Sequence, residues 1–336
     1  MARASEEFLL AWQSLPRSGA ESGWQTIPVT APSAGCAIRA GRKHPSGQEA
    51  VLAGFDQALL LASEKLPDGQ GFFVERVPMD DGWTWLAITR SESGQFDLFV
   101  AMVCDVVGLL DAASQTDRQT QMRLFIERVR AWQEFMRKGV TALGPEREVG
   151  LIGELTVLNG LLDEGLGCST VIDAWKGPLD GEQDFELGMG AIEVKATVSQ
   201  TGFPARVGSL QQLDDHIRQP LFLAGVKLRL NSEGFSLPLL VAQTRERLKE
   251  TPVSSAKFDR LLLDAGHYDG HASQYTRCFE LAELRVLEVT GNFPRLTVGN
   301  VPEGVTAASY SIDLDRNSDT RLSLEQALMK LGMKSK

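Results

Sequence analysis

Hydrophobic and polar positions along the chain predict three successive regions of structure. In the first region, the β-rich segments GFFVERV, WTWLAIT and FDLFVAMV are separated by PMDDG and SESGQ, which have the composition of turns. This pattern predicts an antiparallel meander. An amphipathic helix precedes it at the N-terminus, and two helical stretches follow, the second over residues 118–138. We therefore expect an N-terminal α+β domain over residues 1–142.

The second region, residues 143–230, alternates between helical and strand patterns. Leucines recur at helical spacing in EREVGLIGELTVLNGLLDEG and predict a helix with Glu154 on the flank of its apolar stripe. Short strands are expected at STVIDAW, QDFEL, AIEVKAT and PARVG, then a helix from about Ser209 and an apolar strand at PLFLAGVKLRL. This order of elements is typical of a compact α/β unit.

The third region, residues 231–336, is expected to be an α+β C-terminal extension. Helices are predicted at roughly 236–250 and 254–265, and strands at TRCFEL, ELRVLEVT and ASYSIDL. A final helix is expected from about Leu322. The fold class of the whole chain is therefore α/β, or α+β overall.

The composition is that of a soluble globular protein, because 43% of the 336 residues are hydrophobic and 23% are charged. The most apolar segment, LFVAMVCDVVGLL, is too short to span a bilayer, so no membrane association is expected. The four cysteines form no C-x-x-C pair, which favours free thiols and a cytoplasmic location over a disulfide framework or a zinc site.

The formal net charge of −10 argues against binding nucleic acid through overall positive charge. Residues 146–230 hold seven basic and thirteen acidic groups and so supply −6 of this charge. Clustered carboxylates are what a divalent cation site requires, although an acidic solvated face fits the same counts. The helix over residues 118–138 is positive and could follow a phosphate backbone, but charge runs on helices are more often solvated faces.

A β-hairpin is predicted for the segment GEQDFELGMGAIEVKAT. A register that pairs Glu186 with Ala191 across the four-residue loop LGMG brings Asp184 opposite Glu193 on one face. Lys195 shares that face because side chains two positions apart in a strand project the same way. A three-residue loop would instead put the two acids on opposite faces, so the prediction depends on the register.

Two carboxylates held about 4 to 5 Å apart repel by roughly 3 to 4 kcal/mol at an effective dielectric of about 20. A lysine offsets part of this repulsion, and Mg²⁺ offsets it better because it prefers hard oxygen ligands. The alternative is a surface hairpin held by salt bridges. Spacing alone does not separate the two, since composition supplies about one Glu-x-Lys triplet in a chain of this size.

These residues resemble the motif of the PD-(D/E)XK nuclease superfamily, and more closely a group of PD-(D/E)XK-motif proteins of bacterial restriction and defence loci. The match covers about residues 143–230: Glu154 on a helix, Asp184 at a strand start, IEVK on the next strand, and RVGSLQQL before a second helix. A weaker resemblance to the same group of proteins lies at GNFPRL near the C-terminus. Residue 183 is Gln, so the Pro of the motif's name is missing.

The resemblance implies a restriction-endonuclease-like core, with a mixed central sheet flanked by helices, and a role for each motif residue. Asp184, Glu193 and Val194 are expected to hold Mg²⁺, for which Mn²⁺ would substitute. Lys195 is expected to orient or activate water, and Glu154 to be an accessory acid. Gln212, on the predicted second helix, would complete the site. Arg206, and Arg123 and Arg130 on the positive helix, are candidate DNA contacts.

The implied function is that of a Mg²⁺-dependent DNA endonuclease subunit of a bacterial restriction or phage-defence system. Expected partners are DNA, ATPase, helicase or methyltransferase subunits of such a system, and a second copy of the chain. No Walker A motif is present, so an NTP-driven step would need a partner. The alternative function is that of a catalytically inactive scaffold or DNA-binding subunit with the nuclease fold. His267 and His271 have a metal-compatible spacing, but flanking glycines favour a plain loop.

Overall fold

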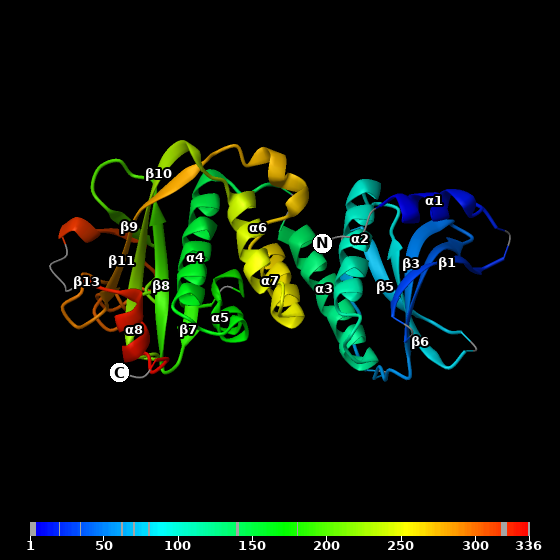
Figure 1. Cartoon of the computed structure of the whole chain (residues 1–336), viewed down its shortest axis with the longest axis horizontal. Helices are drawn as coiled ribbons and strands as arrows, with labels where there is room; N and C mark the ends of the chain where they lie inside the picture. The colour runs from blue at the N-terminus through cyan, green and yellow to red at the C-terminus, as the bar shows by residue number, and fades with distance from the viewer. Residues whose placement is uncertain are drawn as a thin grey trace. The chain divides into compact units, whose positions relative to one another are not determined.

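The structure is a computed structural model of the whole chain. It describes residues 5–19, 21–33, 35–61, 63–69, 71–79, 81–138, 141–179, 181–316 and 321–334. The chain divides into two compact units, Met1–Val140 and Thr141–Lys336, which are coloured blue to cyan and green to red in Figure 1.

The first unit is built on a six-stranded antiparallel sheet with the strand order β1-β2-β3-β6-β5-β4. Its described strands are β1 (Gly23–Ser33), β2 (Cys36–His44), β3 (Gln48–Asp56), β4 (Asp68–Gly69), β5 (Phe72–Val77) and β6 (Trp83–Arg90), and its described helices are α1 (Glu6–Ser14), α2 (Phe96–Ala112) and α3 (Arg118–Lys138). The predicted N-terminal helix and the first two strands of the predicted meander are confirmed.

The third strand of the predicted meander, FDLFVAMV, is wrong because this segment is the start of helix α2. The apolar run continues to Leu110, and 17 residues form one helix that is buried on most of its sides. A segment that is apolar all round has no clear period, so its length decides between strand and helix.

The second unit contains a five-stranded mixed sheet with the order β13-β11-β10-β8-β7 and a two-stranded sheet of β12 and β9. The described strands are β7 (Phe185–Leu187), β8 (Gly190–Thr197), β9 (Pro204–Val207), β10 (Leu221–Phe235), β11 (Phe279–Glu288), β12 (Tyr310–Asp313) and β13 (Arg321–Leu322). The described α-helices are α4 (Pro145–Asp163), α5 (Cys168–Ala174), α6 (Leu237–Leu248), α7 (Pro252–Asp264) and α8 (Leu324–Lys330). Strand β8 runs parallel to β10 and antiparallel to β7.

Two predicted elements of the second unit are wrong. STVIDAW is not a strand but helix α5, because Val171, Ile172 and Ala174 are buried together at helical spacing and this packing overrides their β-propensity. The segment after Ser209 is not a helix but an irregular loop up to Pro220. Polar side chains bond to backbone groups within this loop, as Asp214 does to the His216 N–H, and such bonds compete with helix formation. The predicted strands TRCFEL and ELRVLEVT form a single strand, β11.

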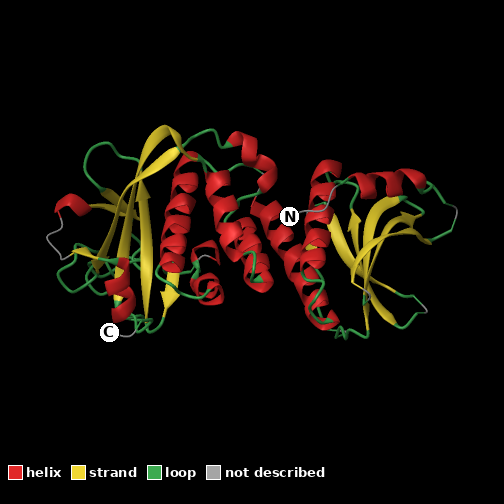
Figure 2. Ribbon diagram, viewed as in Figure 1, coloured by secondary structure: helices red, strands yellow, loops and turns green. Residues whose placement is uncertain are grey.

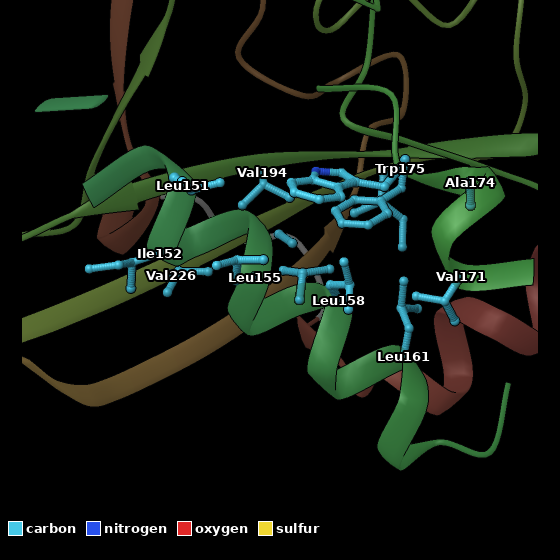
Figure 3. Packing of buried hydrophobic residues seen from close by; sticks show 14 of the residues in the cluster. Leu151, Ile152, Leu155, Leu158, Leu161, Val171, Ala174, Trp175, Val194 and Val226 are labelled. Carbon is cyan, nitrogen blue, oxygen red and sulfur yellow. The ribbon is translucent and has the colours of Figure 1, made fainter. Parts of the chain in front are cut away.

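Two apolar clusters cover the two faces of the larger sheet. Helices α4 to α7 cover one face and form the larger cluster with the inward side chains of β7, β8 and β10 (Figure 2). In Figure 3, Leu151, Leu155 and Leu158 of α4 line up against this cluster near Trp175. The second cluster joins the other face to β9, β12 and the loop residue Leu213. Glu193 and Lys195 of β8 alternate with Ile192 and Val194 of the larger cluster, so they project toward this second face.

No helix in the described parts of the chain is both long and apolar enough to cross a membrane. The four cysteines, all of which lie in the described parts of the chain, form no disulfide with one another.

Candidate functional site

The β7–β8 hairpin positions the acids, and its predicted register is confirmed. Phe185 pairs with Ile192 and Glu186 with Ala191. Leu187 also pairs with Gly190, so the loop is two residues shorter than the predicted LGMG loop while the register is the same. Apolar side chains at alternate positions of both strands enter the larger cluster, which leaves the intervening positions for the opposite face.

Asp184 lies at the point where β7 begins, and its two oxygens have different surroundings. Oδ2 accepts a hydrogen bond of 2.7 Å from the backbone N–H of Val194. Oδ1 faces a small space beside Gly177, because a Cβ built on this glycine would lie 2.8 Å from Oδ1. The same Cβ would lie 2.4 Å from Glu154 Oε2, so both carboxylates face this space.

Glu154 comes to this point from helix α4, which lies close against β8. A Cβ on Gly153 would be only 2.6 Å from the Ala196 methyl carbon, so a larger residue would push the helix away from the strand. The indole Nε1 of Trp175 donates to Glu154 Oε2 at 2.7 Å and holds the carboxylate in place. The predicted position of Glu154, on the flank of the buried stripe of α4, therefore allows it to reach the acids of the hairpin.

Glu193 and Lys195 project from β8 as a neighbouring pair. The Glu193 side chain is only 1% exposed, and its Oε1 lies 2.6 Å from Lys195 Nζ. This contact is an ion pair without the angles of a hydrogen bond, and the buried Oε1 has no hydrogen-bond partner. Lys195 Nζ donates to Gln212 Oε1 at 2.9 Å, and the same oxygen accepts from the Gly208 N–H at 2.7 Å.

Burial raises the pKa values of all three acids, and the charge of Asp184 raises those of the two glutamates further. Burial, and then the charge of Asp184, raise the pKa of Glu154 to about 8, although Trp175 and Lys195 oppose the rise. Burial raises the pKa of Asp184, opposed by Lys195 and by the Val194 N–H. Burial and the charge of Asp184 hold the pKa of Glu193 well above its ordinary value. One lysine does not balance three carboxylates, of which Glu193 is buried and Glu154 and Asp184 are half-buried.

The residues fit a divalent cation in three respects. Their donors are carboxylate oxygens, which hard cations prefer. Gly177 leaves open the space that Glu154 and Asp184 both face, and Glu193 keeps a buried oxygen without a hydrogen bond. Val194 can offer only its backbone carbonyl, because its side chain packs in the larger apolar cluster.

A tighter group of metal-compatible side chains lies elsewhere in the described residues. Ligand atoms of Asp214, Asp215 and His216 lie within 4.8 Å of one another on the loop that follows β9. The acids around Gly177 do not form a group as tight as this one among the described residues. His216 contacts Asp214, and Arg295 lies 2.9 Å from Asp215, so all three residues of this group are accounted for by ion pairs on the loop.

The three candidate DNA contacts lie in different surroundings within their own units. Arg206 is 72% exposed and lies 3.5 Å from Glu146. Arg130 forms an ion pair of 2.6 Å with Glu64 within the first unit, whereas Arg123 is exposed on the same helix. Their role in binding DNA stays a prediction.

The two histidines of the GHYDGH segment do not form a metal pair in the described structure. His267 is buried and stacked on the Tyr275 ring, with 5.6 Å between ring centroids. His271 instead packs edge-on against Tyr268. The plain-loop interpretation holds only in part, because His267 lies in irregular structure whereas His271 lies in the short 3-10 helix Asp269–Gln274.

Three residues of the site were missed by the sequence analysis: Trp175, Gly177 and Gln183. Trp175 and Gly177 contact Glu154 and Asp184 only in the folded protein, so no local sequence pattern identifies them as site residues. Gln183 was noted only as a missing proline, yet its side chain is 3% exposed and bonded to the loop that carries Gln212.

Comparison with known families agrees with the geometry of the hairpin. A family model described as "Putative PD-(D/E)XK family member, (DUF4420)" matches residues 9–315. The chain belongs to this PD-(D/E)XK family. The resemblance inferred from the motif is therefore confirmed, and the mixed sheet flanked by helices is consistent with the restriction-endonuclease-like fold. No curated protein and no solved structure matched the chain.

Membership of a PD-(D/E)XK family associates the chain with nucleases, which generally use divalent metals. The match covers both units and leaves only short segments at each end. Asp184, Glu193 and Lys195 are the residues whose spacing resembles the motif, and residue 183 is Gln where the motif's name has proline.

Proposed function

We propose that the protein is a Mg²⁺-dependent DNA endonuclease subunit of a bacterial restriction or phage-defence system. The observation that carries this proposal is the imbalance of charge at the β7–β8 hairpin. The half-buried Glu154 of α4 and Asp184, and the buried Glu193, converge beside a single amine at the hairpin that carries the proposed PD-(D/E)XK motif residues.

Each residue has a role that follows from its contacts. Asp184 and Glu193 would hold the cation, and the Val194 carbonyl could serve as a further oxygen ligand. A bound divalent cation supplies a Lewis acid that polarises the scissile phosphate and lowers the pKa of a bound water. Lys195, fixed by Gln212, orients that water and stabilises the charge that develops on the phosphate.

Glu154 acts on the proposed metal ligand Asp184 rather than on the attacking water. The Trp175 hydrogen bond fixes its carboxylate toward Gly177, where it faces the Asp184 carboxylate. With its pKa near 8, the metal-free carboxyl group holds a proton at neutral pH. Release of this proton would accompany cation binding and would make the affinity for the cation rise with pH.

A pocket of the second unit is our candidate for part of the substrate-binding surface. It has a volume of about 700 Å³ and is lined by residues 294–296, residues 310–313 and Arg316. Strand β12 forms part of its wall and pairs with β9, which ends directly before Gly208 of the Lys195–Gln212 contact. Tyr310 in this wall lies close enough for the Lys195 charge to oppose the rise in pKa that burial causes.

Plasmid cleavage tests the proposed function. Supercoiled DNA is incubated with the protein and Mg²⁺ or Mn²⁺, together with Asp184→Ala, Lys195→Ala and the matched control Glu186→Gln. Glu186 lies on the same strand as Asp184 but forms an ion pair of 2.8 Å with Arg218 outside the acid cluster. We expect cleavage by the wild type and by Glu186→Gln, and a loss of about 10² to 10⁴ in rate for Lys195→Ala.

Cleavage that survives both Asp184→Ala and Lys195→Ala would contradict the site. If no cleavage is seen, calorimetric titration with Mn²⁺ shows whether the protein still binds the cation. Cation binding without cleavage, in the presence of candidate partner subunits, would favour the inactive scaffold or DNA-binding subunit. Absence of cation binding would remove the metal site itself.

A further inference from the structure

We propose that Gln183 is a positioning residue that fixes Lys195 through the loop after β9. This inference rests on the proposed function, since it concerns the residue expected to orient the water. It assigns a role to the position at which the chain departs from the motif's proline.

The side chain of Gln183 is buried and directed at a backbone group. Its Nε2 donates to the carbonyl of Gln211 at 3.1 Å, and the residue is only 3% exposed. Loss of the partner of a buried amide leaves a polar group without a hydrogen bond and destabilises the fold, so this bond restrains the loop. Because Gln183 directly precedes Asp184, the restraint ties the loop to the strand that begins with the first proposed metal ligand.

The bond acts on Lys195 through the next residue of the loop. Gln212 follows Gln211, and its Oε1 accepts from both Lys195 Nζ and the Gly208 N–H. The oxygen is thus held between the catalytic amine and the end of β9. A shift of the Gln211 carbonyl would move the Gln212 backbone and with it this oxygen.

The loop depends on such contacts because it has no helix or strand to hold it. From Gly208 to Pro220 its described structure consists of turns, bends and irregular segments. The Gln211 carbonyl also accepts from the Asp214 N–H, and Arg295 donates to the Leu213 carbonyl at 2.7 Å. Gln183 is the contact among these that comes from the metal-binding hairpin. A proline at position 183 could not provide it, since proline has no side-chain donor.

Gln183→Met tests the inference because it keeps the length and most of the volume of the side chain and removes the amide. The matched control is Gln200→Met, which makes the same change at an exposed glutamine. We expect Gln183→Met to lower kcat for plasmid cleavage about 10-fold, with less than about a 2-fold change in KM and in Mn²⁺ affinity, as for outer-shell partners of other metal sites. Gln200→Met is expected to leave all three unchanged.

A double-mutant cycle with Gln212→Ala decides whether Gln183 acts through Gln212. If it does, Gln183→Met causes no further loss of kcat in the Gln212→Ala background, because the linkage is already broken. Full additivity of the two losses would overturn the inference. A merely structural role would lower Tm in both backgrounds and leave kcat at temperatures below Tm unchanged.

Amide hydrogen exchange gives a readout that does not need nuclease activity. We expect faster exchange of the Gly208 N–H in Gln183→Met and in Gln212→Ala, but not in Gln200→Met. Unchanged exchange in Gln183→Met would overturn the linkage. If the exchange results hold while the wild type cleaves no nucleic acid, the proposed function fails and the linkage stands.

Discussion

Two glutamates, the half-buried Glu49 in the first unit and the buried Glu193 in the second, lie in opposite electrostatic surroundings. In the first unit, Glu49 accepts from Arg42 Nη1 at 2.9 Å through one oxygen and from Arg90 Nη2 at 2.6 Å through the other. Burial raises the pKa of Glu49, but the hydrogen bonds from Arg90 and Arg42 outweigh it and hold the pKa below the ordinary value. Glu193 in the second unit faces two acids and one lysine, and its pKa is raised.

The number of positive groups beside each carboxylate distinguishes the structural Glu49 from Glu193, which we propose as a cation ligand. Each oxygen of Glu49 has its own guanidinium, so a cation would gain little by binding there. Around Glu193 the negative groups outnumber the positive ones, and a divalent cation would relieve both their repulsion and their raised pKa values. The PD-(D/E)XK motif thus coincides with the place where charge is least balanced.

The largest expected effect is that of Asp184→Asn on catalysis. Loss of this carboxylate removes a cation ligand, and metal assistance is worth several kcal/mol, so we expect the cleavage rate to fall by about 10³-fold or more. Glu49→Gln should change the rate by less than about 2-fold while lowering the free energy of unfolding by about 1 to 3 kcal/mol. Steady-state cleavage and chemical denaturation of both variants measure the contrast. Equal losses of cleavage rate in Asp184→Asn and Glu49→Gln would contradict the assignment of a catalytic role to Asp184 and a structural role to Glu49.

The two sites are expected to give stability opposite dependences on pH. Because the folded protein holds the Glu154 proton more tightly than an unfolded chain does, this contribution is complete below pH 4.5 and is lost as the pH rises toward 8. The metal-free protein should therefore lose stability over this range, on the order of a few kcal/mol, and Glu154→Gln should flatten the loss. The pKa of Glu49 is lower in the folded protein than its ordinary value of 4.5, so Glu49 stabilises the fold at pH values above 4.5. This contribution to stability is lost as the pH falls through the lowered pKa.

Thermal denaturation from pH 4 to 9 in a chelating buffer measures both slopes. The Glu49→Gln variant serves as the internal control. The difference in Tm between this variant and the wild type should shrink at acid pH, whereas the loss of Tm caused by the acid cluster should grow at alkaline pH. A Glu154→Gln protein that retains the full alkaline loss would show that this residue is not its source.

A smaller effect is expected for Gly177→Ala. The added methyl group would enter the space that Glu154 Oε2 and Asp184 Oδ1 share, at 2.4 and 2.8 Å from them, so one or both carboxylates must move. We expect Mn²⁺ affinity to fall about 10-fold, comparable to the loss of an outer-shell partner. Calorimetric titration measures this change, and Gly150→Ala, where an added Cβ meets nothing within 4 Å, is the matched control.

The smallest expected effect is that of Arg206→Ala on DNA binding. This exposed residue would contact phosphate without fixing the site, so its loss should weaken binding similarly for all sequences and lower the salt slope by about 1. Binding to catalytically inactive protein across a range of salt concentrations tests this. An unchanged slope would exclude Arg206 from the DNA contacts.

Local patterns in the sequence predicted the hairpin well but not its surroundings. Strict alternation of apolar and polar residues set the register that aligns Asp184 with Glu193, and helical spacing put Glu154 on the correct flank of α4. The helix expected at Ser209 was wrong because bonds such as Gln183 to the Gln211 carbonyl hold that segment as a loop. Trp175 and Gly177 were not predicted because their importance arises only when α4 and β7 are brought together.

A crystal structure of the protein soaked in Mn²⁺ tests the central claim most directly. The account predicts anomalous density at the Gly177 end of the β7–β8 hairpin, at about 2.0 to 2.4 Å from oxygens of Asp184 and Glu193. Density confined to Asp214, Asp215 and His216, or none at the hairpin in a crystal that binds Mn²⁺ elsewhere, would contradict it.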